Sequence, residues 1–250
     1  MSGHSKWSTI KRAKGITDAK RGALFTKVAR EISVAARQGG GDPDANYRLR
    51  LAIEKARSVN MPADNIKRTI DKATGGGDAE QFEEIVYEGY GPGGVAILVE
   101  TATDNKNRTA ADVRSIFAKA GGSLAGAGSV AWQFAPRGVV AVVRNGRNPD
   151  DIALEAIDLG ADDVDTESDP IEVLTDPGHL EKLRADLEAT GVKVESAEVT
   201  MQPKSPIDVD EHVARQNLRL MEHLEDLDDV QRVTANFNLP AEVLAEVSID

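Results

Sequence analysis

The stretch Gly138 to Arg144, GVVAVVR, opens the part of the chain whose pattern decides the fold. Such an unbroken apolar run, rich in valine and placed after Pro136, predicts a buried strand. A helix over 150–159, two strands, a helix over 177–190 and a strand over 192–201 are expected to follow. This βαββαβ order is typical of the ferredoxin-like arrangement, in which an antiparallel sheet carries both helices on one face. The pattern predicts a domain spanning 136–205.

The segments on either side of this unit predict a second α+β domain. The turn Gly91-Pro-Gly-Gly94 joins two strands with a period of two, and the last elements of the chain are too few for a core of their own. The expected elements are 84–90, 95–101, 108–120, 129–134, 210–224 and 230–237. We expect the C-terminal elements to complete the sheet begun at residue 84, so the domain comprises 78–135 plus 206–250, with 136–205 inserted into it.

Residues 1–77 predict a helical domain with three helices, at 18–38, 43–59 and 62–74. Glycine triplets at 39–41 and 75–77 end the first and the third helix, and Asp42-Pro43 is expected to cap and begin the second. The first helix has an apolar face that recurs at helical spacing. Its members are Leu24, Phe25, Val28, Ile32, Ala35 and Ala36. The fold class is therefore α+β, with an N-terminal three-helix domain followed by two ferredoxin-like α+β domains, one inserted into the other.

Charge divides the chain more sharply than its total of -12 indicates. Residues 1–74 hold 16 Lys and Arg against 7 Asp and Glu, a net charge of +9, whereas residues 75–250 carry -21. Surface charges more than about 8 Å apart are largely screened at physiological salt, so the basic module can meet an anionic polymer on its own. This asymmetry predicts a nucleic-acid partner for the N-terminal domain.

The candidate nucleic-acid contacts lie on an N-terminal arm that ends near Thr17 and on the basic side of the first helix. Lysine and arginine there can neutralise phosphates, and Trp7 can stack on a base. The candidates are His4, Lys6, Trp7, Lys11, Arg12, Lys14, Lys20, Arg21, Lys27, Arg30 and Arg37. Further cations extend the surface over the other two helices, namely Arg48, Arg50, Lys55, Arg57, Lys67 and Arg68. The alternative is a merely solvated basic face, and charge alone leaves it open.

Several other classes of site are disfavoured. The chain has no cysteine, and its four histidines lack a ligand spacing, so no metal site is expected. The glycines of 89–94 fit G-x-G-x-x-G, but a strand follows them where a dinucleotide loop needs a helix, so we expect a turn and no cofactor. No apolar run is long enough for a membrane span or a signal peptide, which favours the cytoplasm. We expect a protein that is not an enzyme; its oligomeric state is left open.

Several motifs closely resemble those of the YebC/PmpR family over nearly the whole chain. They are Gly3-His-Ser-Lys-Trp7, Lys11-Arg-Ala-Lys14, Asp18-Ala-Lys-Arg21, Tyr87-Glu-Gly-Tyr-Gly-Pro-Gly-Gly94 and Thr103-Asp-Asn-Lys-Asn-Arg-Thr109. The resemblance implies a three-domain fold and a DNA-binding transcriptional regulatory protein. Mitochondrial relatives are described as translational activators of cytochrome c oxidase. Bacterial relatives are linked to the relief of stalled ribosomes, so the alternative is a translation factor that binds rRNA or tRNA. The acidic extension from Leu239 departs from the family pattern.

Overall fold

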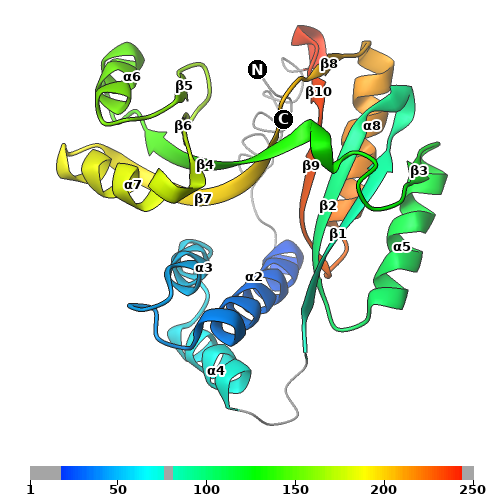
Figure 1. Ribbon diagram of the computed structural model, residues 1–250, viewed down its shortest axis with the longest axis horizontal. Helices are drawn as coiled ribbons and strands as arrows, with labels where there is room; N and C mark the ends of the chain where they lie inside the picture. The colour runs from blue at the N-terminus through cyan, green and yellow to red at the C-terminus, as the bar shows by residue number, and fades with distance from the viewer. Residues whose placement is uncertain (1–17, 76–80, 244–250) are drawn as a thin grey trace. The chain divides into compact units, whose positions relative to one another are not determined.

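The computed structural model describes residues 18–75 and 81–243 (Figure 1). Two compact units make up the chain. The first runs up to Trp132 and takes in Val209–Ala235 as well. The second contains Gln133–Asp208 and the stretch that begins at Asn236. The predicted basic arm, up to Thr17, lies outside the described residues.

Three helices open the first unit: α2 (Asp18–Gly39), α3 (Tyr47–Ser58) and α4 (Ala63–Thr74). α2 packs against both of the others (Figure 1). The apolar face predicted for α2 is confirmed, because its side chains are buried or half-buried in the core shared with α3 and α4. The fully buried members of this core on α2 and α3 are Val28, Ile32, Ala35, Ala36, Leu49, Ala52 and Ala56.

The start predicted for the second helix is wrong by one turn. Asn46, and not Asp42, is the N-cap of α3, and its side chain accepts a hydrogen bond from the N–H of Leu49 at 3.0 Å. The same side chain donates to the carbonyls of Ala35 and Gly40 at 2.8 Å, which ties the cap to the end of α2. Asp42 accepts from the N–H of Asp44 instead, an Asx turn that competes with helix initiation.

The sheet of the first unit is antiparallel, with strand order β3-β1-β2-β9. Its strands are β1 (Glu83–Tyr90), β2 (Ala96–Thr103), β3 (Ser123–Leu124) and β9 (Val230–Ala235). Two helices that contact each other, α5 (Lys106–Lys119) and α8 (Glu211–Glu225), pack on it. The expectation that the C-terminal strand returns to the sheet begun at residue 84 is confirmed, because β9 pairs with β2.

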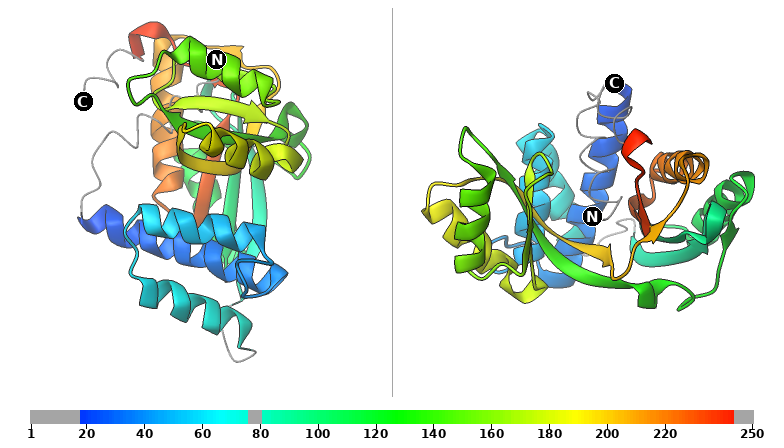
Figure 2. Two further views of the ribbon diagram at one scale, coloured as in Figure 1. Left: turned by 90° about the vertical axis from the view of Figure 1, so that its left-hand side faces the viewer. Right: turned by 90° about the horizontal axis from the view of Figure 1, so that it is seen from above.

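The second unit has the order βαββαβ and a sheet arranged β5-β6-β4-β7, with all neighbours antiparallel. Its strands are β4 (Phe134–Val143), β5 (Asp163–Asp165), β6 (Ile171–Thr175) and β7 (Lys193–Pro203). The helices α6 (Pro149–Asp158) and α7 (Leu180–Ala189) cover one face of this sheet (Figure 2). This is the ferredoxin-like order. A short parallel pair, β8 (Ile207–Asp208) with β10 (Phe237–Asn238), completes the unit.

The strand expected at 129–134 and the start of the next strand expected after Pro136 are both wrong. Ala131–Gln133 form a 3-10 turn, and β4 begins at Phe134 and continues through Pro136. Pro136 lies opposite Met201 of β7, whereas β6 joins β4 only from Gly138 onward. The missing N–H of proline therefore falls where β4 has a neighbour on one side only, which is where sheets accept proline. The α+β class, with three helices before the antiparallel sheets, is confirmed.

Candidate nucleic-acid interface

The N-terminal helices carry a set of exposed cations. None of their side chains makes a hydrogen bond or an ion pair with the part of the chain that the structure describes. The set is Arg37 on α2, Arg57 on α3, and Lys67, Arg68 and Lys72 on α4. Arg37, Arg57 and Lys72 lie in the last turns of their helices, where the helix dipole favours positive charge. These side chains can meet phosphates without giving up a partner. We refer to them as the exposed cations.

Two of the candidate nucleic-acid contacts on α2, Lys27 and Arg30, have internal partners instead. The ammonium of Lys27 donates to the backbone carbonyl of Glu225 at the end of α8. The guanidinium of Arg30 donates to the carboxylate of Asp229 at 2.5 Å and lies 5.3 Å from the ring centre of Phe82. The side chain of Arg30 is only 14% exposed. Of the α2 candidates whose side chains are described, Arg37 alone faces solvent, and the side chains of Lys20 and Arg21 lie outside the description.

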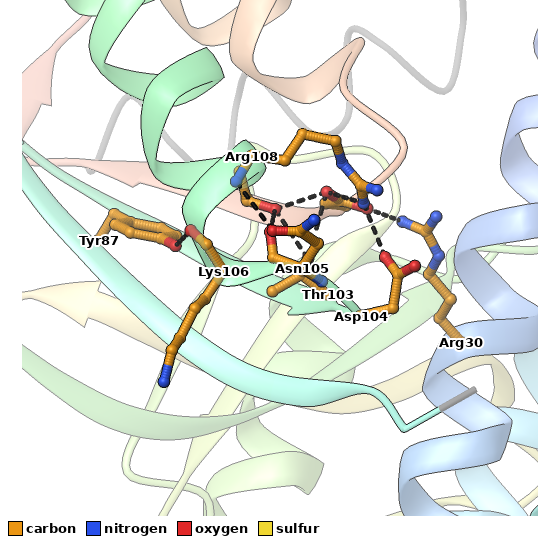
Figure 3. A network of polar contacts seen from close by, with 9 residues as sticks. Arg30, Tyr87, Thr103, Asp104, Asn105, Lys106 and Arg108 are labelled. Atoms are coloured by element: carbon orange, nitrogen blue, oxygen red, sulfur yellow. Dashed lines mark hydrogen bonds and ion pairs between the residues drawn. The ribbon is translucent and has the colours of Figure 1, made fainter. Parts of the chain in front are cut away.

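Asp229 is the hub of a buried polar network, and Figure 3 labels its partners Arg30, Thr103 and Arg108. The residue is 6% exposed and lies in the turn between α8 and β9. Besides Arg30, its carboxylate accepts from Arg108 at 2.9 and 3.1 Å, from the hydroxyl of Thr109 at 2.6 Å and from that of Thr103 at 3.3 Å. Its own carbonyl accepts from the N–H of Ala102 at 2.8 Å. A buried charge with this many donors is fully compensated.

The motif Thr103–Thr109 supplies most of this network. Asn105 is the N-cap of α5 and accepts from the N–H of Arg108 at 3.1 Å, while the hydroxyl of Thr103 accepts from the N–H of Asn105 at 2.9 Å. Arg108 also donates to Asp104 at 2.7 Å. Tyr87 donates its hydroxyl to the carbonyl of Lys106 at 3.1 Å, as Figure 3 shows. The motif thus joins the end of β2 to the start of α5 and to Asp229.

The network shifts the proton affinities of its members. Burial alone would raise the pKa of Asp229, but hydrogen bonds from Arg108 and Thr109 and the positive charges of Arg30 and Arg108 outweigh it and lower the pKa below its ordinary value. Hydrogen bonds to Asp229 and Asp104 raise the pKa of Arg108. Both groups are therefore held in their charged forms.

The hollow beside the network does not suit a phosphate. Its volume is about 470 Å³, and its lining includes Arg30 and Arg108 but also five aspartates. Its net charge is therefore negative, which repels an anion. Among the described residues, no group of three or more His, Asp or Glu side chains is arranged to hold a metal ion. Likewise, none of the described helices is long and apolar enough to cross a membrane.

Two further predicted cations also have acidic partners. Arg48 pairs with Glu84, and the hydrogen bond between them is the largest cause of the raised pKa of Arg48. Lys55 pairs with Glu31 at 2.7 Å. Both pairs are partly exposed, so each contributes little to stability.

The glycine motif ending at Gly94 has a packing role. Pro92–Gly94 form a 3-10 turn between β1 and β2, which confirms the turn interpretation over the dinucleotide loop. A Cβ on Gly91 would lie 2.1 Å from Oδ1 of Asn217, and one on Gly89 would lie 2.7 Å from the ring of Phe117. Close packing requires these glycines.

Sequence reasoning missed Asp229 and Glu88. The buried carboxylate of Glu88 accepts from the N–H groups of Gly128, Val130 and Ala131 at 2.6, 2.7 and 2.8 Å. Burial would raise its pKa, but these hydrogen bonds lower it. Glu88 could have been singled out, since it lies inside the motif Tyr87–Gly94. Asp229 stands in an acidic run that is indistinguishable from a solvated surface.

Comparison with known proteins fits this architecture. Residues 5–76 match the family model of the TACO1/YebC protein N-terminal domain, and residues 82–237 match that of the TACO1/YebC second and third domain. A "Probable transcriptional regulatory protein" of Rubrobacter xylanophilus is 52% identical to this chain, and the match covers 99% of this chain and 100% of that protein. A relative with the same description from Dehalococcoides mccartyi is 53% identical, and the match covers 98% of this chain and 97% of that protein.

A solved structure supports the same relationship. The crystal structure of a conserved hypothetical protein, Aq1575, from Aquifex aeolicus is 44% identical and superposes with a TM-score of 0.85. The match covers 91% of this chain and 94% of that one. The chain therefore belongs to the TACO1/YebC family.

Proposed function

We propose that this chain is a transcriptional regulatory protein that binds DNA through its N-terminal helices. The observation that carries this proposal is the set of exposed cations on α2, α3 and α4, in a segment whose net charge is +9. The names of the full-length relatives, "Probable transcriptional regulatory protein", point to the same class. In this proposal the protein acts in the cytoplasm and is not an enzyme.

The mode of binding follows from the kind of residue in the set. Lysine and arginine neutralise backbone phosphates, and the release of counterions makes such binding steeply dependent on salt. Phosphate contacts position a protein on a duplex but carry no sequence information directly. Because the described helices offer no base-reading array at a recognised spacing, shape and backbone recognition is the expected mode.

The domain limits set out from the sequence remain part of this proposal. Residues 1–77 would act as the binding module, and the discontinuous domain 78–135 plus 206–250 would anchor it. The domain 136–205 would be inserted between the two parts of this discontinuous domain. The arm residues His4, Lys6, Trp7, Lys11, Arg12 and Lys14, together with Lys20 and Arg21, stay candidates that join the exposed cations.

Electrophoretic shifts on promoter fragments test the proposal. The protein should bind cognate promoter duplex more tightly than a scrambled duplex of equal length, and the triple variant Arg57→Ala, Lys67→Ala, Arg68→Ala should weaken both. A matched triple on α5 and β7, Arg114→Ala, Lys119→Ala, Lys193→Ala, removes the same charge from exposed positions elsewhere. Equal weakening by both triples would contradict the assignment of the interface. Equal binding to every duplex, with ribosomal RNA preferred, would favour the translation factor.

A further inference from the structure

The loop between α5 and β4 differs from the rest of the surface. Residues 121–132, GGSLAGAGSVAW, contain no charged side chain in a chain that is 29% charged. Trp132, at the end of this loop, is 68% exposed. The other aromatic side chains that the structure describes are buried or half-buried. An exposed indole on an uncharged loop is therefore unusual within this molecule.

The loop is held in place by buried groups. Three of its N–H groups are bound by the carboxylate of Glu88, and the hydroxyl of Tyr90 donates to the carbonyl of Ser129 at 3.1 Å. The indole N–H of Trp132 donates to that same carbonyl at 3.1 Å. The N–H of Ala125 donates to the carbonyl of Glu88 at 2.7 Å, and β3 pairs with β1. Preorganisation of this kind lowers the entropic penalty of binding.

The loop that carries the indole fits a flat, uncharged partner. Gly126 and Gly128 present no side chain, and a Cβ on Gly128 would meet no atom within 4 Å. A protein partner would need roughly 800 Å² of complementary surface. The remaining large exposed apolar side chains among the described residues lie on β1, α6 and β7. The loop therefore offers one aromatic ring.

We propose that Trp132 is a stacking site for an unpaired nucleobase of a single-stranded nucleic acid, an assignment that rests on the proposed function. The exposed cations hold the phosphates, and the indole receives a base. Every base has a π-face, so stacking on an aromatic ring tolerates any sequence. A base inside a duplex is already stacked and paired, so Trp132 discriminates in favour of unpaired segments. The strand can be DNA or RNA, because the stacking chemistry is shared.

Intrinsic fluorescence isolates this site, because the chain has only two tryptophans, Trp7 and Trp132. In the full-length variant Trp7→Phe, all indole emission comes from Trp132. An oligoadenylate single strand is expected to quench this emission on binding. An abasic oligomer of equal length and charge should bind through phosphates but quench little. Binding of each oligomer is followed independently by the anisotropy of a terminal label.

Affinity changes provide the second readout. Base–aromatic stacking contributes about 1–3 kcal/mol per base, so Trp132→Ala should weaken binding of the oligoadenylate about 5- to 150-fold. Trp132→Phe should restore most of the loss, and neither variant should change the affinity for the abasic oligomer. Val199→Ala, another exposed apolar side chain, is the matched control and should leave both affinities unchanged.

The outcomes separate the stacking site from the proposed function. Equal quenching and equal affinity for abasic and base-containing strands would overturn the stacking site while leaving phosphate binding intact. No binding of either single strand by a protein that still binds promoter duplex would overturn the stacking site alone, whereas loss of duplex binding as well would overturn the proposed function. Base-dependent quenching by DNA alone, by RNA alone or by both would support the site, and would identify the strand that it takes.

Discussion

Two groups of cations on the N-terminal helices consist of the same residue types but differ in whether their side chains have partners inside the protein. Lys27 and Arg30 on α2 bind a backbone carbonyl and a buried carboxylate, whereas Arg57, Lys67 and Arg68 on α3 and α4 face solvent. The first group stabilises the attachment of α2 to the turn between α8 and β9. The second group is available to an anionic partner. Net charge predicts that a segment can bind nucleic acid, but only the partners of each side chain show which cations can take part.

The largest effect is expected at the hub of the first group. Asp229→Ala leaves Arg30 buried without its carboxylate and removes one acceptor of Thr109, which should lower the free energy of unfolding by about 3 kcal/mol. Urea denaturation measures the change. The neighbouring Asp228→Ala is the control, because Asp228 is exposed and should shift stability by no more than about 0.5 kcal/mol. Equal losses in the two variants would mean that the network does not stabilise the fold.

A smaller loss is expected from Arg30→Ala. It removes one of the donors to Asp229 but leaves Arg108 and Thr109 in place, so the free energy of unfolding should fall by about 2 kcal/mol. Arg37→Ala, which changes the exposed arginine on the same helix, should leave stability within about 0.5 kcal/mol of wild type. Chemical denaturation of both variants distinguishes the two situations, and the reverse ranking would contradict them.

Acid should weaken the same network. Since the pKa of Asp229 is lowered in the folded state, its carboxylate contributes stability that is fully present above its unfolded pKa, about 3.9, and is lost as pH falls through the folded pKa. Glu88 follows the same rule. Wild type should therefore lose more stability below about pH 4 than Asp229→Asn, which has no proton to bind there. Parallel pH profiles of unfolding for the two proteins would show that Asp229 does not titrate as described.

The smallest effect is expected at Arg48, whose pair with Glu84 is partly exposed. Arg48→Ala should lower the free energy of unfolding by less than about 1 kcal/mol, because solvent screens such pairs. The loss should shrink further in 0.5 M salt, whereas that of Asp229→Ala should persist. A salt-insensitive loss as large as that of Asp229→Ala would erase the distinction between the exposed and the buried pair.

Much of the fold follows from patterns along the chain. Helical periodicity located the buried face of α2, an unbroken apolar run located β4, and the small size of the C-terminal segment predicted that β9 returns to the first sheet. Local rules failed where long-range pairing decides the outcome. Pro136 is tolerated because β6 does not reach it, and Asn46 caps α3 because it also binds the end of α2. Neither condition is visible in a window of neighbouring residues.

The candidate site was predicted less completely, for the same physical reason. A basic N-terminal segment is a property of composition, but the carboxylate that engages Arg30 comes from Asp229, 199 positions away. Glu88 holds the loop that carries Trp132, because the loop between α5 and β4 folds back onto β1. Such pairings depend on the tertiary fold, so a single sequence shows the residues and not their partners.

The salt dependence of duplex binding tests most directly the claim that the exposed cations, and not Lys27 and Arg30, meet DNA. The logarithm of the binding constant would be measured against the logarithm of salt concentration for wild type, for the triple Arg57→Ala, Lys67→Ala, Arg68→Ala, and for the double Lys27→Ala, Arg30→Ala. The magnitude of the slope should fall by up to about 3 in the triple, or about 0.9 per lost phosphate contact, and stay unchanged in the folded double variant. A fall in the double with none in the triple would contradict the account.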